Sequence, residues 1–256
     1  MNPEKKSNFL KLFTLGSALL TCALRAAHYG FGTDGRGLLI PNHWSVWGIS
    51  VVSAVFGAVL LLLGSSIPRK GDAPRPASPV SAAGCFALGA VLLAAGLRSF
   101  GESGLPADYL IWALGLCAGT GLILVGICRW SGKKPYFLFH AFLCLYIALR
   151  MVSTYRQWSS EPQLQDYGFY LMAHAAIMLT AYHHAAFDAG LGSHRALWIC
   201  SLCTVFLGCA ALPRCGEPLL MGAAALWAFT NLTAIPLRQR RTRPALKTEE
   251  SGDETA

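Results

Sequence analysis

Several arginine and histidine side chains lie inside long apolar runs of this 256-residue chain. A charged group in lipid hydrocarbon costs about 3 kcal/mol or more, so such residues usually have a partner or a function. One group combines guanidinium, imidazole and hydroxyl groups near the predicted outer ends of their segments: Arg25, His28, Arg150, Thr154, Tyr170 and His174. Because arginines bind carboxylate or phosphate oxygens through paired hydrogen bonds, this outer group predicts an anion-binding pocket.

A second group, near the predicted inner ends, comprises His140, His184 and Asp188. His184 and Asp188 are four residues apart, so on a helix they share one face and can hydrogen-bond. Histidine titrates near neutral pH, which favours a proton relay, and interhelical hydrogen bonding is the structural alternative. Zinc needs three or four converging ligands, and His183 would point about 100° away from His184. We therefore expect no metal, no cofactor and no catalytic residues.

The composition places these groups in a membrane protein. Hydrophobic residues make up 54% of the chain and charged residues 13%, whereas a soluble domain has roughly 25% charged residues. The net charge is +8, but the bases fall between apolar runs, so nucleic-acid binding is not expected. The nine cysteines lie almost entirely within apolar runs, which is typical of structural residues.

Eight apolar stretches are long enough, or nearly so, to cross a bilayer, which takes about 20 residues. The expected fold is an all-α, polytopic transmembrane helix bundle formed by residues 1–237 as a single domain. Its spans lie near residues 9–29, 44–64, 80–100, 108–129, 136–155, 167–188, 196–213 and 218–237. If the first span were cleaved as a signal peptide, seven spans would remain. Arg25 would then lie just past the cleavage site, which is unusual and favours an uncleaved first helix.

The basic residues predict the orientation. Fifteen of the 21 Lys and Arg residues lie in the N-terminal segment, the even-numbered connections and the tail, and six lie on the other side. The positive-inside rule then places both termini in the cytoplasm, and we expect an integral protein of a cell membrane, the plasma membrane. The tail, residues 238–256, has almost no apolar content and is expected to be disordered on the inner side.

Polar residues share one face in the first, fifth and sixth spans. Residues three, four and seven apart lie on the same side of a helix, and a polar face in a membrane points away from lipid. In the sixth span this face follows positions 170, 174, 177, 181, 184 and 188. We therefore expect helices 1, 5 and 6 to enclose a polar interior, with residues 155–167 as an outer lid or an interfacial cap.

Two interpretations of the outer group stay open. Its arginines either line the anion pocket or reach the outer headgroups and pair with outer acids: Asp34, Glu102, Asp108, Glu161, Asp166 and Glu217. The outer side holds six acids and six bases, which supports the second interpretation.

The sequence therefore predicts a multi-pass membrane protein that binds or transports a small polar or anionic solute through helices 1, 5 and 6. The lipid bilayer and such a solute are the expected partners. The alternative is a sensor, a receptor or a partner-binding membrane subunit in which the polar residues between the helices have only a structural role. An intramembrane enzyme is the least favoured class, because the inner group is too sparse for a reactive constellation.

Overall fold

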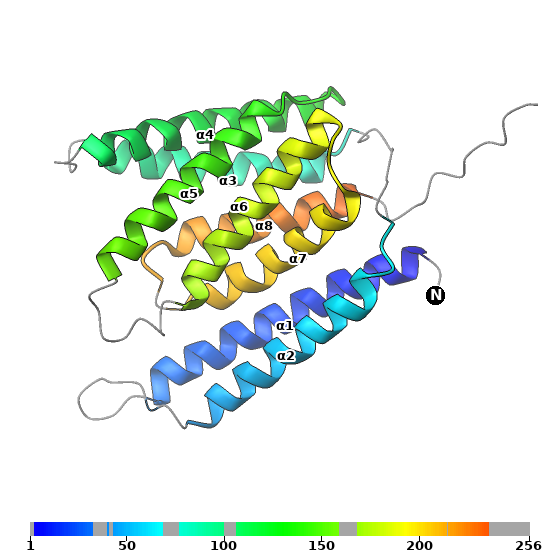
Figure 1. Ribbon diagram of the computed structural model, residues 1–256, viewed down its shortest axis with the longest axis vertical. Helices are drawn as coiled ribbons and strands as arrows, with labels where there is room; N and C mark the ends of the chain where they lie inside the picture. The colour runs from blue at the N-terminus through cyan, green and yellow to red at the C-terminus, as the bar shows by residue number, and fades with distance from the viewer. Residues whose placement is uncertain are drawn as a thin grey trace, which may run out of the picture.

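The computed structural model describes residues 3–32, 40, 43–68, 77–99, 106–158, 168–213 and 215–235. Within these ranges every predicted span is a helix, and the helices alternate in direction along one axis (Figure 1). Their bounds are α1 Pro3–Phe31, α2 Trp44–Gly64, α3 Pro79–Ser99, α4 Pro106–Trp130, α5 Leu138–Trp158, α6 Gly168–Ala189, α7 His194–Ala211 and α8 Pro218–Ala234. The predicted lid, residues 155–167, lies mostly outside the described residues, and the tail 238–256 lies wholly outside them.

Six helices in the described ranges, α1 to α5 and α7, are long and apolar enough to cross a membrane, as in a multi-pass membrane protein. The other two explain why the span count differs from the expected eight. The apolar helix α8 has 17 residues. Helix α6 has 22 residues, but His174, His184 and Asp188 lower its hydropathy.

Local sequence signals set several helix ends. Gly132 and Gly190 follow α4 and α6 with φ of 68° and 86°, a left-handed conformation that glycine adopts without a Cβ clash. Ser193 caps α7 by accepting a hydrogen bond from the backbone N–H of Ala196. Pro218 occupies the first turn of α8, where its missing N–H costs nothing.

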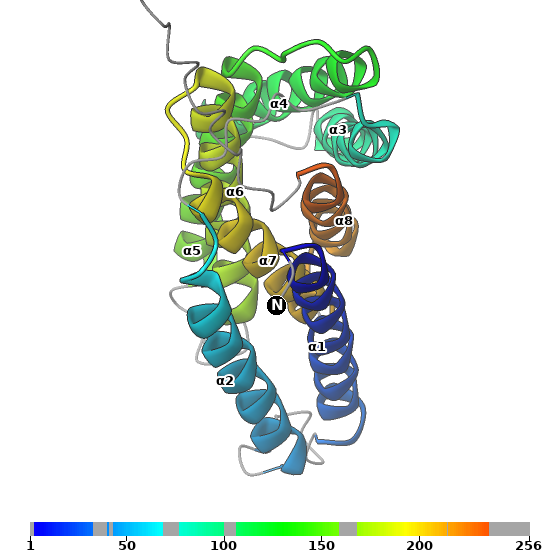
Figure 2. The ribbon, with the colours of Figure 1, turned by 90° about the vertical axis from the view of Figure 1, so that its right-hand side faces the viewer.

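Helices α3 to α8 form a closed ring in which each helix packs on the next, and α8 packs back on α3. The α1–α2 pair lies outside this ring and attaches to it mainly through α1 and α7, as Figure 2 shows. We call the end of the bundle where α1 begins the inner end, and the opposite end the outer end. The expectation that helix 1 encloses one polar interior with helices 5 and 6 is therefore wrong.

The predicted polar faces are nevertheless buried. The predicted polar face of α6 is buried at all six of its positions, residues 170, 174, 177, 181, 184 and 188. The polar face of α1 is buried too, including Thr14, Thr21 and Arg25, but it packs on α2 and α7. The polar faces predicted for α1 and α6 are therefore buried, but the face of α1 packs on other helices than the expected ones.

Close approach of α3 and α8 depends on Gly84. A methyl group built at Gly84 would overlap Thr230 Oγ1 and lie 3.1 Å from the Cα atom of Trp227. The Thr230 hydroxyl donates a hydrogen bond to the Trp227 carbonyl at 3.0 Å, so it is not free to rotate away without loss. A side chain at position 84 must therefore push the two helices apart.

We expect Gly84→Ala to lower the free energy of unfolding by about 1–3 kcal/mol, the usual cost of overpacking. Gly57→Ala in α2 is the matched control, because a methyl group there meets nothing within 4 Å and alanine favours a helix. Thermal unfolding of both variants in detergent micelles measures the difference. Equal stabilities of the two variants would contradict the close packing of α3 on α8.

Candidate functional site

The inner half of the ring contains a cluster of two histidines and one aspartate, which we call the His–Asp cluster. His140 of α5 faces α6, and its Nδ1 lies 3.1 Å from Asp188 Oδ2. The His140 and His184 rings stack with centroids 5.1 Å apart and planes tilted by 16°. The structure thus brings all three residues of the predicted inner group together.

The cluster is shielded from water on the side of α8. The Trp227 ring lies 5.0 Å from the His184 ring and 6.2 Å from the His140 ring, between centroids. Both histidines are 0% exposed, and Asp188 is 5% exposed. Electrostatic interactions strengthen in such a low-dielectric environment, so the charge on one member depends strongly on the protonation of the others.

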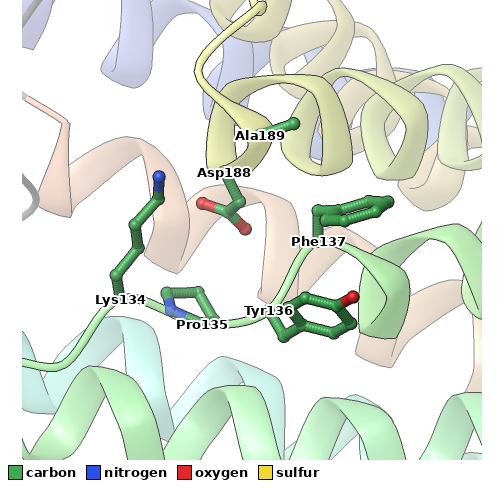
Figure 3. Close-up of a pocket in the computed structure, with 6 residues that line it drawn as sticks. All are labelled: Lys134, Pro135, Tyr136, Phe137, Asp188 and Ala189. Carbon is green, nitrogen blue, oxygen red and sulfur yellow. The ribbon is translucent and has the colours of Figure 1, made fainter.

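A pocket of about 380 Å³ connects Asp188 to the inner end of the bundle. The connection between α4 and α5 forms one wall, and the last turn of α6 forms the other (Figure 3). Its lining residues are Lys134, Pro135, Tyr136, Phe137, Asp188 and Ala189. The volume falls in the usual range for small-molecule sites, about 300–1,000 Å³. The Asp188 carboxylate is therefore placed between the pocket and His140.

The cluster is better suited to moving a proton than to holding a metal. Stacked imidazole rings do not direct their nitrogens at one point, and among the described residues no three His, Cys, Asp or Glu side chains form a group that could hold a metal ion. A pair of a histidine and a carboxylate can take up and release a proton. The chemistry that this geometry supports is protonation and deprotonation of the His140–Asp188 pair.

The predicted outer group is divided between two places. Arg150 of α5 forms an ion pair with Glu217, the residue before α8, and the Tyr170 hydroxyl donates to the other Glu217 oxygen at 3.1 Å. The His174 ring packs edge-on against Tyr170, with centroids 4.3 Å apart. Thr154 is buried one turn after Arg150 on α5. Arg150, Tyr170 and His174 thus gather beside Glu217 at the outer end of the ring, and we call these four residues the outer cluster.

Arg25 and His28 lie elsewhere, on α1. The Arg25 guanidinium donates to the Ala210 carbonyl at 2.7 Å, in the last turn of α7, and its Cζ lies 4.6 Å from the Phe169 ring centroid. A cation at a helix C-terminus is favoured by the helix dipole. His28 shares a hydrogen bond with the Ser45 hydroxyl at 2.8 Å. Arg25 thus joins α1 to α7 and reaches Phe169 at the start of α6, and His28 joins α1 to α2.

The connection before α8 also contains Cys215. Its sulfur accepts a hydrogen bond from the Glu217 backbone N–H at 3.2 Å. Burial raises the pKa of the Cys215 thiol, so this thiol stays protonated at neutral pH. A reactive thiolate is therefore not part of the outer cluster.

The sequence analysis missed a third polar cluster. Arg129 at the end of α4 donates to the Ser81 hydroxyl of α3 at 2.7 Å and to Asn231 Oδ1 of α8. Arg129 is one of the fifteen basic residues that predict the orientation, and it is 4% exposed. The available signal was Asn231, an amide side chain in an otherwise apolar span, where such a residue usually has a partner. Trp227, four residues earlier on α8, was missed because an aromatic residue in an apolar run carries no distinctive signal.

Comparisons with protein families, with known proteins and with solved structures found no match. The function is therefore inferred from the chemistry of the site.

The Arg150–Glu217 pair gives a direct test of the outer cluster. Their side chains are 33% and 24% exposed, so partial solvation reduces the 3–5 kcal/mol that breaking a buried pair costs. We expect Glu217→Gln to lower the free energy of unfolding by about 1–3 kcal/mol. The double variant with Arg150→Gln should lose less than the sum of the single losses, because the second change removes the charge left unpaired.

Unfolding of all four proteins in the same micelles gives the coupling energy. Additivity of the two single effects within about 0.5 kcal/mol would show that the pair does not interact.

Proposed function

We propose that this multi-pass membrane protein binds a small anionic solute at the inner pocket and moves it along the axis of the α3–α8 ring together with a proton. The observation that carries the proposal is the buried His140–Asp188 pair, with Nδ1 and Oδ2 3.1 Å apart, whose aspartate lines a pocket at the inner end of the bundle. Ionisable residues inside a membrane commonly mark solute or proton pathways.

The charges around the pocket support an anion with a proton as the transported unit. Lys134 lines the pocket, and Lys133 precedes it in the chain, so these two positive charges attract anions. The Asp188 carboxylate, which also lines the pocket, would repel an anion. Protonation of the His140–Asp188 pair removes that repulsion, which couples solute binding to proton binding.

The outer cluster is the natural second gate in this proposal. Arg150, Glu217 and Tyr170 hold α5, α6 and the start of α8 together at the outer end of the ring. An anion arriving there could compete with Glu217 for Arg150, because guanidinium binds any carboxylate in the same way. In this role Arg150 keeps the anion-binding function expected from the sequence.

A sensor or receptor is the second candidate, and one observation favours it. Between the two polar clusters, the ring is filled by apolar side chains that are fully buried, including Leu143, Ile147, Ile177 and Met221. A solute can bind at the inner pocket without crossing this layer. Binding without flux would then be the function, with a partner protein supplying the output.

The proposed orientation keeps both termini in the cytoplasm of a plasma-membrane protein. It rests on the positive-inside rule, with Lys133 and Lys134 at the inner end, as are Lys5 and Lys6 at the start of α1.

Proteoliposomes loaded with a pH-sensitive dye test the proposal, with succinate and glutamate as separate probes. We expect uptake of at least one probe to acidify the lumen, because the solute and the proton cross together in this proposal. Asp188→Asn should reduce proton-coupled uptake at least about tenfold, the equivalent of 1.4 kcal/mol.

His183→Gln is the matched control, since His183 is adjacent in sequence to His184 but only partly buried and outside the cluster. Uptake by this variant should equal that of the wild type. If a probe binds but the dye shows no acidification of the lumen, the result supports a sensor or receptor and not a transporter. Equal uptake by Asp188→Asn and wild type would disprove the role of the His–Asp cluster.

A further inference from the structure

Arg129 is a buried cation whose contacts are all with neutral groups. It lies in the last turn of α4 and is 4% exposed. Its Nη1 atom makes the contacts with Ser81 Oγ, Asn231 Oδ1 and Cys85 Sγ. In the part of the chain that the structure describes, no carboxylate forms an ion pair with it. A buried guanidinium without a counter-charge is strongly unfavourable, so a negatively charged group beside Arg129 would stabilise it.

The atoms of Arg129 that lack a partner form one edge of the guanidinium. Nε and Nη2 are both buried and have no hydrogen-bond partner. These two nitrogens point their N–H groups in parallel, which is the fork that binds two oxygens of a phosphate or carboxylate. The contacts of Nη1 with α3 and α8 fix the plane of the guanidinium and do not involve Nε or Nη2.

A second arginine at the inner end of the bundle uses the same two nitrogens to donate to two oxygen atoms. Arg195, at the start of α7, donates from Nε to the Ile67 carbonyl at 2.8 Å and from Nη2 to the Ser65 carbonyl. Two carbonyl oxygens that follow α2 therefore accept from the two Arg195 nitrogens that correspond to the unpartnered Nε and Nη2 of Arg129.

Several positive groups lie near Arg129 at the inner end of the bundle. The Ser78 backbone N–H donates to the Arg129 carbonyl at 3.1 Å, which holds the beginning of α3 against the end of α4. The first turn of a helix carries a partial positive charge, and Lys133 and Lys134 follow Arg129 in the chain. All of these groups favour a negatively charged ligand at this end of the ring.

We propose that Arg129 is the centre of an oxyanion site that binds a phosphate group at the inner end of the α3–α4–α8 packing. Nε and Nη2 hold two phosphate oxygens, while Ser81 and Asn231 position the guanidinium through Nη1. The phosphate comes either from the headgroup of an anionic lipid in the inner leaflet or from a soluble phosphate. The site is separate from the His–Asp cluster and does not depend on transport.

The test measures the thermal stability of the purified full chain in detergent with two probes. Inorganic phosphate is titrated in one arm, and phosphatidylglycerol is added to the micelles in the other, with diacylglycerol as the lipid that lacks phosphate. We expect the wild type to be stabilised saturably by one of the two phosphate probes and not by diacylglycerol. A response to phosphatidylglycerol alone assigns the phosphate to a lipid, and a response to inorganic phosphate assigns it to a soluble ligand.

Arg129→Lys keeps the charge and removes the fork. It should weaken the apparent affinity for the active probe about tenfold or more, because a bidentate charge-assisted contact becomes a single one. Arg195→Lys is the matched control at the same end of the bundle, and its response should equal that of the wild type. Asp188→Asn should also keep the response, which separates this site from the proposed transport site.

Three results would overturn the proposal. They are no stabilisation of the wild type by either phosphate probe, an unchanged affinity in Arg129→Lys, and loss of the response in Asp188→Asn. If Arg129→Lys does not fold, Ser81→Ala takes its place. That variant loses one contact that positions the guanidinium, so an affinity for the active probe equal to that of the wild type would likewise overturn the proposal.

Discussion

A side chain that carries charge must find its partner inside the protein when the surrounding medium is lipid, because hydrocarbon offers neither hydrogen bonds nor counter-ions. The α3–α8 ring is arranged around this constraint. At its inner end His140 meets Asp188, and at its outer end Arg150 meets Glu217. The first pair joins the consecutive helices α5 and α6, and the second joins α5 to the connection before α8, so satisfying the charges also holds these elements together. Arg25, outside the ring, meets the same constraint by donating to a carbonyl at the end of α7.

The two polar clusters are separated by an apolar layer, and this separation is what gives the ring its proposed function. His140 and Arg150 are ten residues apart on α5, roughly 15 Å along a helix. Between them, Leu143 and Ile147 pack fully buried against the neighbouring helices. A proton or solute at one cluster is thus isolated from the other in this conformation. Packed cores switch between discrete arrangements, so access from the two ends would alternate only if this layer repacks.

Much of the fold and part of the candidate site were predictable from the sequence. Helix α2 begins and ends at the predicted residues, 44 and 64, because an apolar run between turn signals leaves few other choices. The α6 stripe was predictable too, since helical periodicity and the cost of lipid exposure act within one segment. The inner cluster followed from it, as His184 and Asp188 lie on one face. Glu217 could not be assigned to Arg150, because a loop acid has several possible bases within reach.

The sequence by itself determined the helical segments, the buried faces of the first and sixth helices and the predicted orientation, because periodicity, length and charge placement are local properties of the chain. Only the tertiary structure decided which buried faces meet. A polar stripe shows that a helix turns away from lipid and carries no information about its neighbour. Helix α1 therefore packs mainly on α2 and α7, whereas the sequence led us to expect α5 and α6. The contact of Arg129 with Asn231 was decided in the same way, by the close approach of α3 and α8 that Gly84 permits.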